Sequence, residues 1–168
     1  MVAAAVLAGT GCTPERGQDV PEVPPGIAFE ALRFRTYRGS RLLASGRAER
    51  ASLRRDNSDL AAERVEVRLP GEQGQPDVLL EAPAAQGNMA AHNFEVSGGV
   101  VATRGGDVAR TERAFYDGAD GLVHGDLPVA IRGEEYAFDG PRFTLDPSDG
   151  RVTVEGGARL TWRGRRER

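Results

Sequence analysis

The sequence has a single cysteine, Cys12, no lysine, and no uninterrupted apolar run of about 20 residues. One thiol excludes an internal disulfide and a multi-cysteine metal site. The missing apolar run excludes a membrane-spanning helix in the chain as given. All 22 basic residues are arginines interspersed among 25 acidic residues, and the net charge is −3. This even mixture gives no nucleic-acid footprint, so we expect no nucleic-acid partner.

Groups that carry out catalysis are isolated. No serine lies in a G-x-S-x-G setting. The two histidines, His92 and His124, are far apart, and we interpret them as surface turn residues although His124 is followed by Gly125-Asp126. Acidic residues occur in or near turns at Asp139, Asp146, Asp149 and Glu155. Their spacing does not require the shared cleft of a glycosidase. We therefore predict no enzymatic activity, no metal site and no cofactor.

The first residues are typical of an export signal. Residues 1–11 are small and apolar, Cys12 follows at once, and residues 13–26 are rich in proline. A lipoprotein signal has this order, because the cleaving enzyme needs small side chains beside the cysteine that is then acylated. We expect a signal segment at 1–12 with lipidation at Cys12, and a tether at 13–26. The alternative is a trimmed secretory signal or a membrane-helix stub beside an incidental cysteine.

The rest of the chain has the pattern of short strands. The 22 glycines and 10 prolines recur at short intervals, with D-G, G-G and G-D between apolar runs. Val65, Val67 and Leu69 face one way, while the arginines and glutamate between them face the other. Residues 50–63 are the best candidate for one or two helical turns. We expect strands at residues 29–37, 41–50, 62–69, 78–82, 91–96, 100–103, 108–111, 113–116, 122–124, 129–131, 136–138, 143–145, 151–154 and 158–162.

This spacing predicts an all-β domain over residues 27–163, as an antiparallel sandwich, barrel or roll. It is followed by a basic tail at 164–168, which we interpret as a solvated end. One run carries a resemblance. From residue 93 it reads NFEVSGGVVAT, then GDVARTERAFYD, GLVHGDLPVAI, YAFDGPRFTLD and GRVTVEGGARL.

This run resembles the LptC-type periplasmic proteins of lipopolysaccharide export and their LptA and OstA relatives. Residues 108–116 take the place of the family's L-x-T-x-x-A element, and Pro128-Val129 take the place of its P-V element. Residues 34–48 are similar to its opening hairpin, and the resemblance covers about residues 27–162. The lipoprotein-like leader departs from the membrane-spanning helix with which that family usually begins.

The resemblance implies an open, twisted antiparallel jelly roll of two facing sheets, preceded by a disordered or helical leader. It also implies a periplasmic, membrane-tethered protein of a Gram-negative bacterium that holds the acyl chains of lipopolysaccharide in an apolar trough. Its implied partners are other jelly rolls of the export bridge and the inner-membrane transporter, joined by unpaired edge strands. The alternative function is a membrane-tethered β-sandwich lipoprotein that binds carbohydrate or protein.

Alternation predicts which apolar side chains point inward to line the trough or, alternatively, to form a sealed core. These are Phe34, Leu43, Val65, Val67, Leu80, Phe94, Val96, Val101, Phe115, Val129, Ile131, Phe138, Phe143, Leu145, Val152 and Val154. The partner-binding edges are expected at both ends of the domain. Their residues are Ile27, Phe29, Leu32, Ala158, Leu160 and Trp162.

Overall fold

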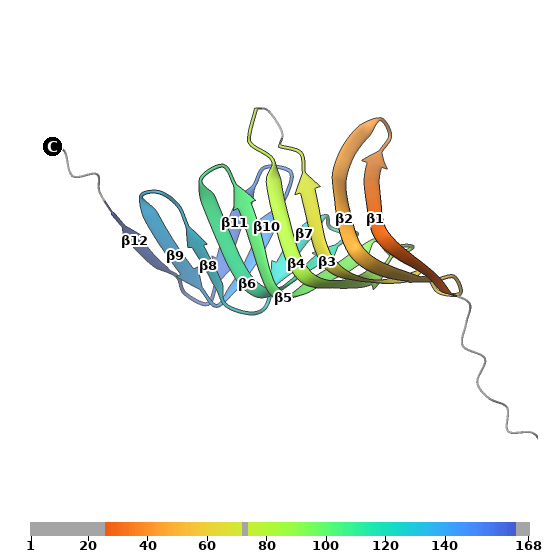
Figure 1. Ribbon diagram of the computed structural model, residues 1–168. Helices are drawn as coiled ribbons and strands as arrows, with labels where there is room; N and C mark the ends of the chain where they lie inside the picture. The colour runs from red at the N-terminus through yellow and green to blue at the C-terminus, as the bar shows by residue number, and fades with distance from the viewer. Residues whose placement is uncertain (1–25, 72–73, 164–168) are drawn as a thin grey trace, which may run out of the picture.

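The computed structural model describes residues 26–71 and 74–163, so the predicted leader with Cys12, nearly all of the tether and the basic tail lie outside the described residues. Twelve strands form one antiparallel sheet, and the all-β prediction is confirmed (Figure 1). The strands are β1 (Gly26–Arg38), β2 (Arg41–Arg54), β3 (Asp59–Leu69), β4 (Val78–Asn88), β5 (Asn93–Arg104), β6 (Asp107–Asp117), β7 (Leu122–Gly125), β8 (Val129–Arg132), β9 (Tyr136–Gly140), β10 (Arg142–Asp146), β11 (Arg151–Glu155) and β12 (Arg159–Trp162).

The strands before residue 118 are longer than the sequence pattern indicated. The expected segments 108–111 and 113–116 are one strand, β6, and the expected segments 91–96 and 100–103 are both parts of β5. The suggested helical turns at residues 50–63 are wrong. Leu53 pairs with Leu60 and Ala51 with Ala62, so this region is the hairpin between β2 and β3. Its apolar residues alternate along both strands and turn to one face of the sheet.

One sheet becomes two layers because its long strands bend along a common line. Strands β1 to β6 pair in chain order, and β6 then pairs with two strands at once. Residues 108–111 of β6 pair with β8, whereas residues 115–117 pair with β7. From there β9 and β12 extend one layer, and β10 and β11 extend the other. We call these the β12 layer and the β11 layer.

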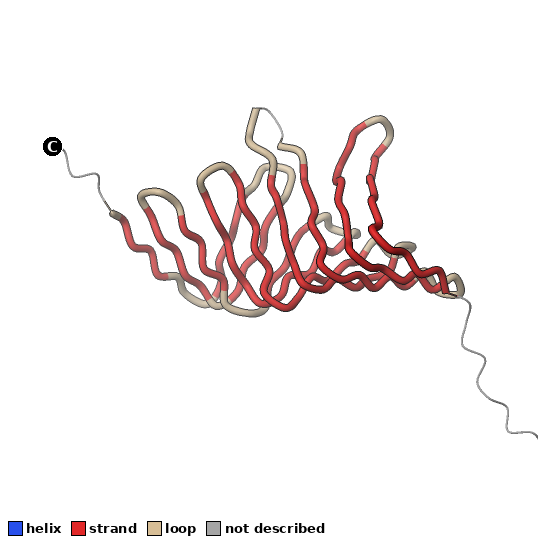
Figure 2. Tube along the Cα trace, in the orientation of Figure 1, coloured by secondary structure: helices blue, strands red, loops and turns tan. Residues whose placement is uncertain are grey.

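The bend is visible as a change of direction in the long strands (Figure 2). Along this line, which we call the crease, the pairing skips Ala31, Glu49, Arg64 and Pro83, and the register shifts again at Gly98-Gly99. Ala31 and Arg64 have the left-handed φ values of 53° and 49°, and Gly98 and Gly99 have φ values of 86° and 98°. Pro83 has no N–H to donate to the ladder. Irregular backbone of this kind bends and twists a strand.

Packing is tight only beside the crease. The buried apolar residues there are mostly small or β-branched: Ala48, Ala51, Ala62, Val65, Ala82, Val100, Ala114, Val129 and Phe143. Seven of them form two clusters, Ala48, Ala51, Ala62 and Val65 in β2 and β3, and Ala114, Val129 and Phe143 farther along the sheet. Both clusters contain residues from each side of the crease. The two layers therefore meet as the closed end of a wedge, where the narrow space favours small side chains.

Because Gly99 lies at the crease, we predict that adding a side chain there lowers the stability of the folded protein. A Cβ on Gly99 meets no atom within 4 Å, but the φ of 98° disfavours any L-residue. We expect Gly99→Ala to lower the free energy of unfolding by about 1–3 kcal/mol in urea titrations. Gly106 is the matched control, because a Cβ there also meets nothing and its φ is ordinary. Equal effects of the two substitutions would refute a backbone constraint at the crease.

Candidate functional site

The inner faces of the two layers form an apolar trough that widens away from the crease. Directly paired residues of an antiparallel sheet share a face, so the register identifies each inner row. In the β12 layer, the row beyond the buried one is almost entirely apolar. It consists of Phe34, Gly46, Val67, Leu80, Ala102, Ala109, Ile131, Phe138 and Leu160.

The β11 layer has a corresponding inner row, one inner position farther from the crease than its buried residues. It consists of Ile27, Leu53, Leu60, Gly87, Phe94, Tyr116, Val123, Leu145 and Val152. Every residue of these two rows is half-buried or exposed, whereas most of those beside the crease are buried. Val100 beside the crease is 4% exposed, whereas the next row is half-buried from Phe34 to Phe138 and becomes exposed at Leu160 in the terminal strand β12, at 63%. The layers therefore do not seal against each other, and apolar surface stays accessible between them.

Aromatic rings in the trough lie against their own layer. Phe34, Phe94 and Phe143 each pair directly with a glycine of the neighbouring strand. A Cβ built on Gly46 would lie 2.5 Å from Cζ of Phe34, one on Gly87 2.6 Å from Cδ1 of Phe94, and one on Gly125 2.5 Å from Cδ1 of Phe143. Each ring thus covers the adjacent glycine. Phe34 and Phe94 remain half-buried, whereas Phe143, beside the crease, also packs in the cluster that contains Val129 of the other layer.

Most of the predicted inward residues lie on the inner faces of the two layers, either in the two rows or beside the crease. Besides those named above, Val65 and Val129 lie beside the crease in the β12 layer, and Val96 and Val154 pack on the Phe143 cluster. The expectation that these residues touch lipid stays a prediction. Leu43 lies at a bulge, where the register of β1 and β2 shifts between Thr36 and Tyr37.

Two predicted trough residues face outward, contrary to expectation. Val101 pairs with Glu81 and Arg110 in a charged row, while its neighbour Val100 takes the inner position. Phe115 pairs with Glu95 and His124 and is 36% exposed, because Ala114 occupies the narrow inner position. Because side chains alternate along β6, Ala114 and Tyr116 take the inner positions and Phe115 lies on the outer face.

Among the larger side chains of the two inner rows, the sequence does not predict Leu53, Leu60, Tyr116 and Val123. Leu53 and Leu60 lie in the region first considered for helical turns. The sequence signal that indicates their inward position is the alternation of apolar residues around the turn, at Ala51 and Leu53 before it and at Leu60 and Ala62 after it.

The ends of the sheet are free edges within the described residues. β1 pairs only with β2, β11 only with β10, and β12 only with β9. Of the predicted edge residues, Phe29 and Leu32 pack against the crease cluster, while Leu160 and Trp162 are 63% and 64% exposed. Ala158 directly precedes β12, and Ile27 lies in β1. β11 is a third edge, in addition to the two that the sequence predicts.

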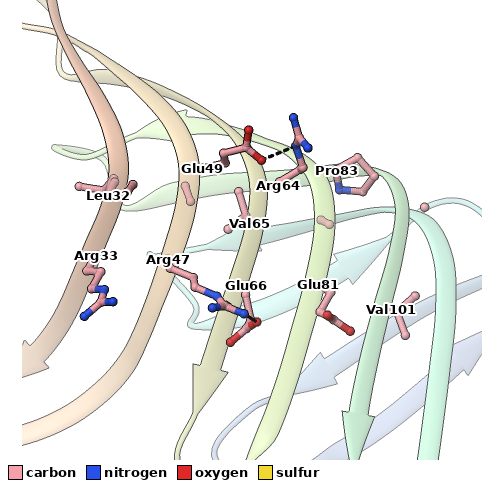
Figure 3. Close-up of a pocket in the computed structure, with 14 residues that line it drawn as sticks. Leu32, Arg33, Arg47, Glu49, Arg64, Val65, Glu66, Glu81, Pro83 and Val101 are labelled. Carbon is pink, nitrogen blue, oxygen red and sulfur yellow. Dashed lines mark hydrogen bonds and ion pairs between the residues drawn. The ribbon is translucent and has the colours of Figure 1, made fainter.

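The outer faces are polar. A hollow of about 640 Å³ lies beside the crease, between residues of β1 to β5 (Figure 3). Two ion pairs cross it, Arg47–Glu66 at 2.5 Å and Arg64–Glu49 at 2.7 Å. Because these charges neutralise each other, we do not regard the hollow as a site for an ionic ligand.

The groups considered for catalysis are dispersed. His124 contacts Asp120 at 3.1 Å on the surface, where the pKa of Asp120 is lowered chiefly by the backbone N–H of Leu122. Arg132 binds Asp139, and Ser148 binds Asp146. Within residues 26–71 and 74–163 no three His, Cys, Asp or Glu side chains are placed to hold a metal ion. The described part of the chain also contains no helix long and apolar enough to cross a membrane.

Comparison with solved structures shows the fold. The chain is similar to the crystal structure of LptH, the LptA-homologous periplasmic component of the conserved lipopolysaccharide transport device from Pseudomonas aeruginosa. The TM-score is 0.51 at 14% identity, covering 70% of this chain and 93% of that one. This similarity and the open two-layer sheet confirm the expected jelly-roll architecture. The sequence matches no family model and no curated protein.

The contact between Gly125 and the Phe143 ring predicts that substitutions at these two positions have coupled effects on the free energy of unfolding. We expect Gly125→Ala to lower the free energy of unfolding by about 1–3 kcal/mol, because the added Cβ overlaps the Phe143 ring. In a Phe143→Leu background the same substitution is expected to cost less, since the smaller side chain moves aside. Urea titration of the four proteins in this double-mutant cycle measures the coupling. Equal costs in both backgrounds would contradict the ring–glycine contact.

Proposed function

We propose that this protein is a periplasmic component of the inner-to-outer membrane bridge that exports lipopolysaccharide. The observation that carries the proposal is the wedge-shaped trough, whose inner rows are apolar and only half-buried. Acyl chains inserted there would leave water at a gain of about 0.8 kcal/mol per methylene. The sugars of the same molecule would stay in solvent at the open side. Binding by this mechanism needs no catalytic group and no cofactor.

The free edges supply a way of joining neighbouring proteins. At one end the bent strand β1 is the edge of both layers, and at the other end β11 and β12 are separate edges. Inside the molecule β6 shows the same relation, because one bent strand pairs with β7 and β8. A jelly roll of the bridge, or of the inner-membrane transporter, therefore fits at either end by strand addition, which would continue the trough from one protein to the next.

The anchoring proposed from the sequence follows the same function. Acylation of Cys12 and the proline-rich tether would hold the domain at a membrane of a Gram-negative cell while leaving the trough in the periplasm. The alternative, a β-sandwich lipoprotein that binds carbohydrate or protein, requires a recognition surface on an outer face. A set of exposed aromatic rings on a flat outer face would favour it, but Phe115 has no second Phe, Tyr or Trp beside it in its outer row, whose neighbours are Ser52, Gln86, Glu95 and Thr144.

Site-specific photo-crosslinking tests the trough. A photoreactive amino acid is placed at Phe94 or Ile131, on the inner faces of the two layers, in cells that make lipopolysaccharide. We expect lipopolysaccharide adducts at both positions, detected on immunoblots. Val101 and Phe115 are matched controls, because they are apolar residues on the outer faces of β5 and β6, and Val101 shares β5 with Phe94. Adducts at the controls alone, or at none of the four positions, would contradict the proposal.

A further inference from the structure

The open side of the trough carries one arginine with unusual surroundings. Arg104 ends β5 on the inner face of the β12 layer, two residues beyond the inner-row residue Ala102 and directly opposite Val78 and Asp107. Arg104 is half-buried. Among the other arginines of the described ranges, only Arg113 is also half-buried, and the rest are exposed. Arg113 contacts Asp126 at 2.7 Å, whereas Arg104 has no ion pair within residues 26–71 and 74–163. A guanidinium that is partly desolvated and lacks a carboxylate retains its capacity to bind an anion.

Asp107, directly opposite Arg104, and the two aspartates of the turn that contains Gly150 have other partners. Asp107 accepts a hydrogen bond from the hydroxyl of Tyr136, and burial together with this contact raises the pKa of that hydroxyl. Asp146 accepts hydrogen bonds from Ser148, and Asp149 accepts one from the backbone N–H of Arg151. These carboxylates stabilise their own turns and layer.

Arg104 also reaches the opposite layer. A Cβ built on Gly150, in the turn between β10 and β11, would lie 2.7 Å from Cζ and 3.0 Å from Nη2 of Arg104. The guanidinium therefore lies against the backbone of the β11 layer, at the boundary between the trough and solvent. An amphiphile whose acyl chains occupy the trough would place its polar head at this boundary.

We propose that Arg104 binds a phosphate group on the head of the acylated ligand. The inference rests on the proposed function and adds a polar recognition site at the opening of the trough. The planar guanidinium offers parallel N–H donors that match phosphate oxygens, and the partial burial strengthens the interaction by lowering the local dielectric constant. The phosphate would thereby fix how deeply the acyl chains enter, which apolar contacts alone do not determine.

The test compares two lipids and two variants. The probes are hexa-acylated, bis-phosphorylated lipid A and the same lipid after removal of its phosphates, titrated into the purified protein. Arg104→Gln is expected to weaken binding of the phosphorylated lipid about tenfold and to leave binding of the dephosphorylated lipid unchanged. Arg110→Gln is the matched control, since Arg110 is an exposed outer-face arginine of the adjacent strand with no ion pair among the described residues. It is expected to change neither affinity.

The outcomes separate this inference from the function on which it rests. If the wild-type protein binds neither lipid, the proposed function fails. If it binds both and Arg104→Gln weakens neither, or weakens both equally, only the phosphate site fails. Inorganic phosphate in large excess is expected not to displace the lipid, and displacement would show a site for the free anion instead. Unfolding curves of both variants in urea are compared with the wild-type curve, so that a loss of structure is recognised.

Discussion

The shape of this protein depends on the crease, where the regular pairing is interrupted at corresponding positions of neighbouring strands. A flat sheet of these strands would expose both faces and enclose nothing. Because Ala31 and Arg64 take left-handed backbone conformations and Pro83 and Gly98-Gly99 interrupt the ladder beside them, the strands bend together. The same strands then supply both walls of a wedge. Every inner residue is therefore positioned by its distance from the crease, and burial falls with that distance.

The open trough requires side chains that stay close to their own wall. Large residues that reached across the gap would seal the layers into an ordinary sandwich core. Mostly small residues line the closed end, and phenylalanines there (Phe143) and farther out (Phe34 and Phe94) lie over glycines of the neighbouring strand. These glycines have ordinary φ values at Gly46, Gly87 and Gly125, so their role is to give room to a ring and not to permit a turn. Apolar surface therefore stays accessible between the layers, while each ring still packs against its own sheet.

Much of this fold is predictable from the sequence, because period-two alternation and glycine-rich turns are local signals. The alternation at Val65 and Val67 correctly predicts a strand, and the expected jelly roll is confirmed. The bend is not predictable in this way. It depends on backbone conformations at Ala31 and Arg64, whose residue types do not favour them. Where the bend interrupts a strand, the sequence of one long strand resembles two short strands. The interruption also makes it ambiguous from the sequence whether Val100 or Val101 points inward. Size and hydrophobicity favour burial of Phe115, but the alternation along β6 gives the inner positions to Ala114 and Tyr116.

The two ends and the open side of the wedge differ in chemistry, and this difference gives the trough a direction. Along its length the walls end in unpaired strands, with Leu160 and Trp162 exposed on the inner face, so apolar surface continues to the end of the domain. Across its width the apolar rows give way to Arg104, Asp107 and Tyr136. An acylated molecule would meet little resistance to movement along the trough but would lose polar contacts by sinking deeper into it. A binding surface with this anisotropy suits a protein that passes an amphiphile to a neighbour better than one that stores it.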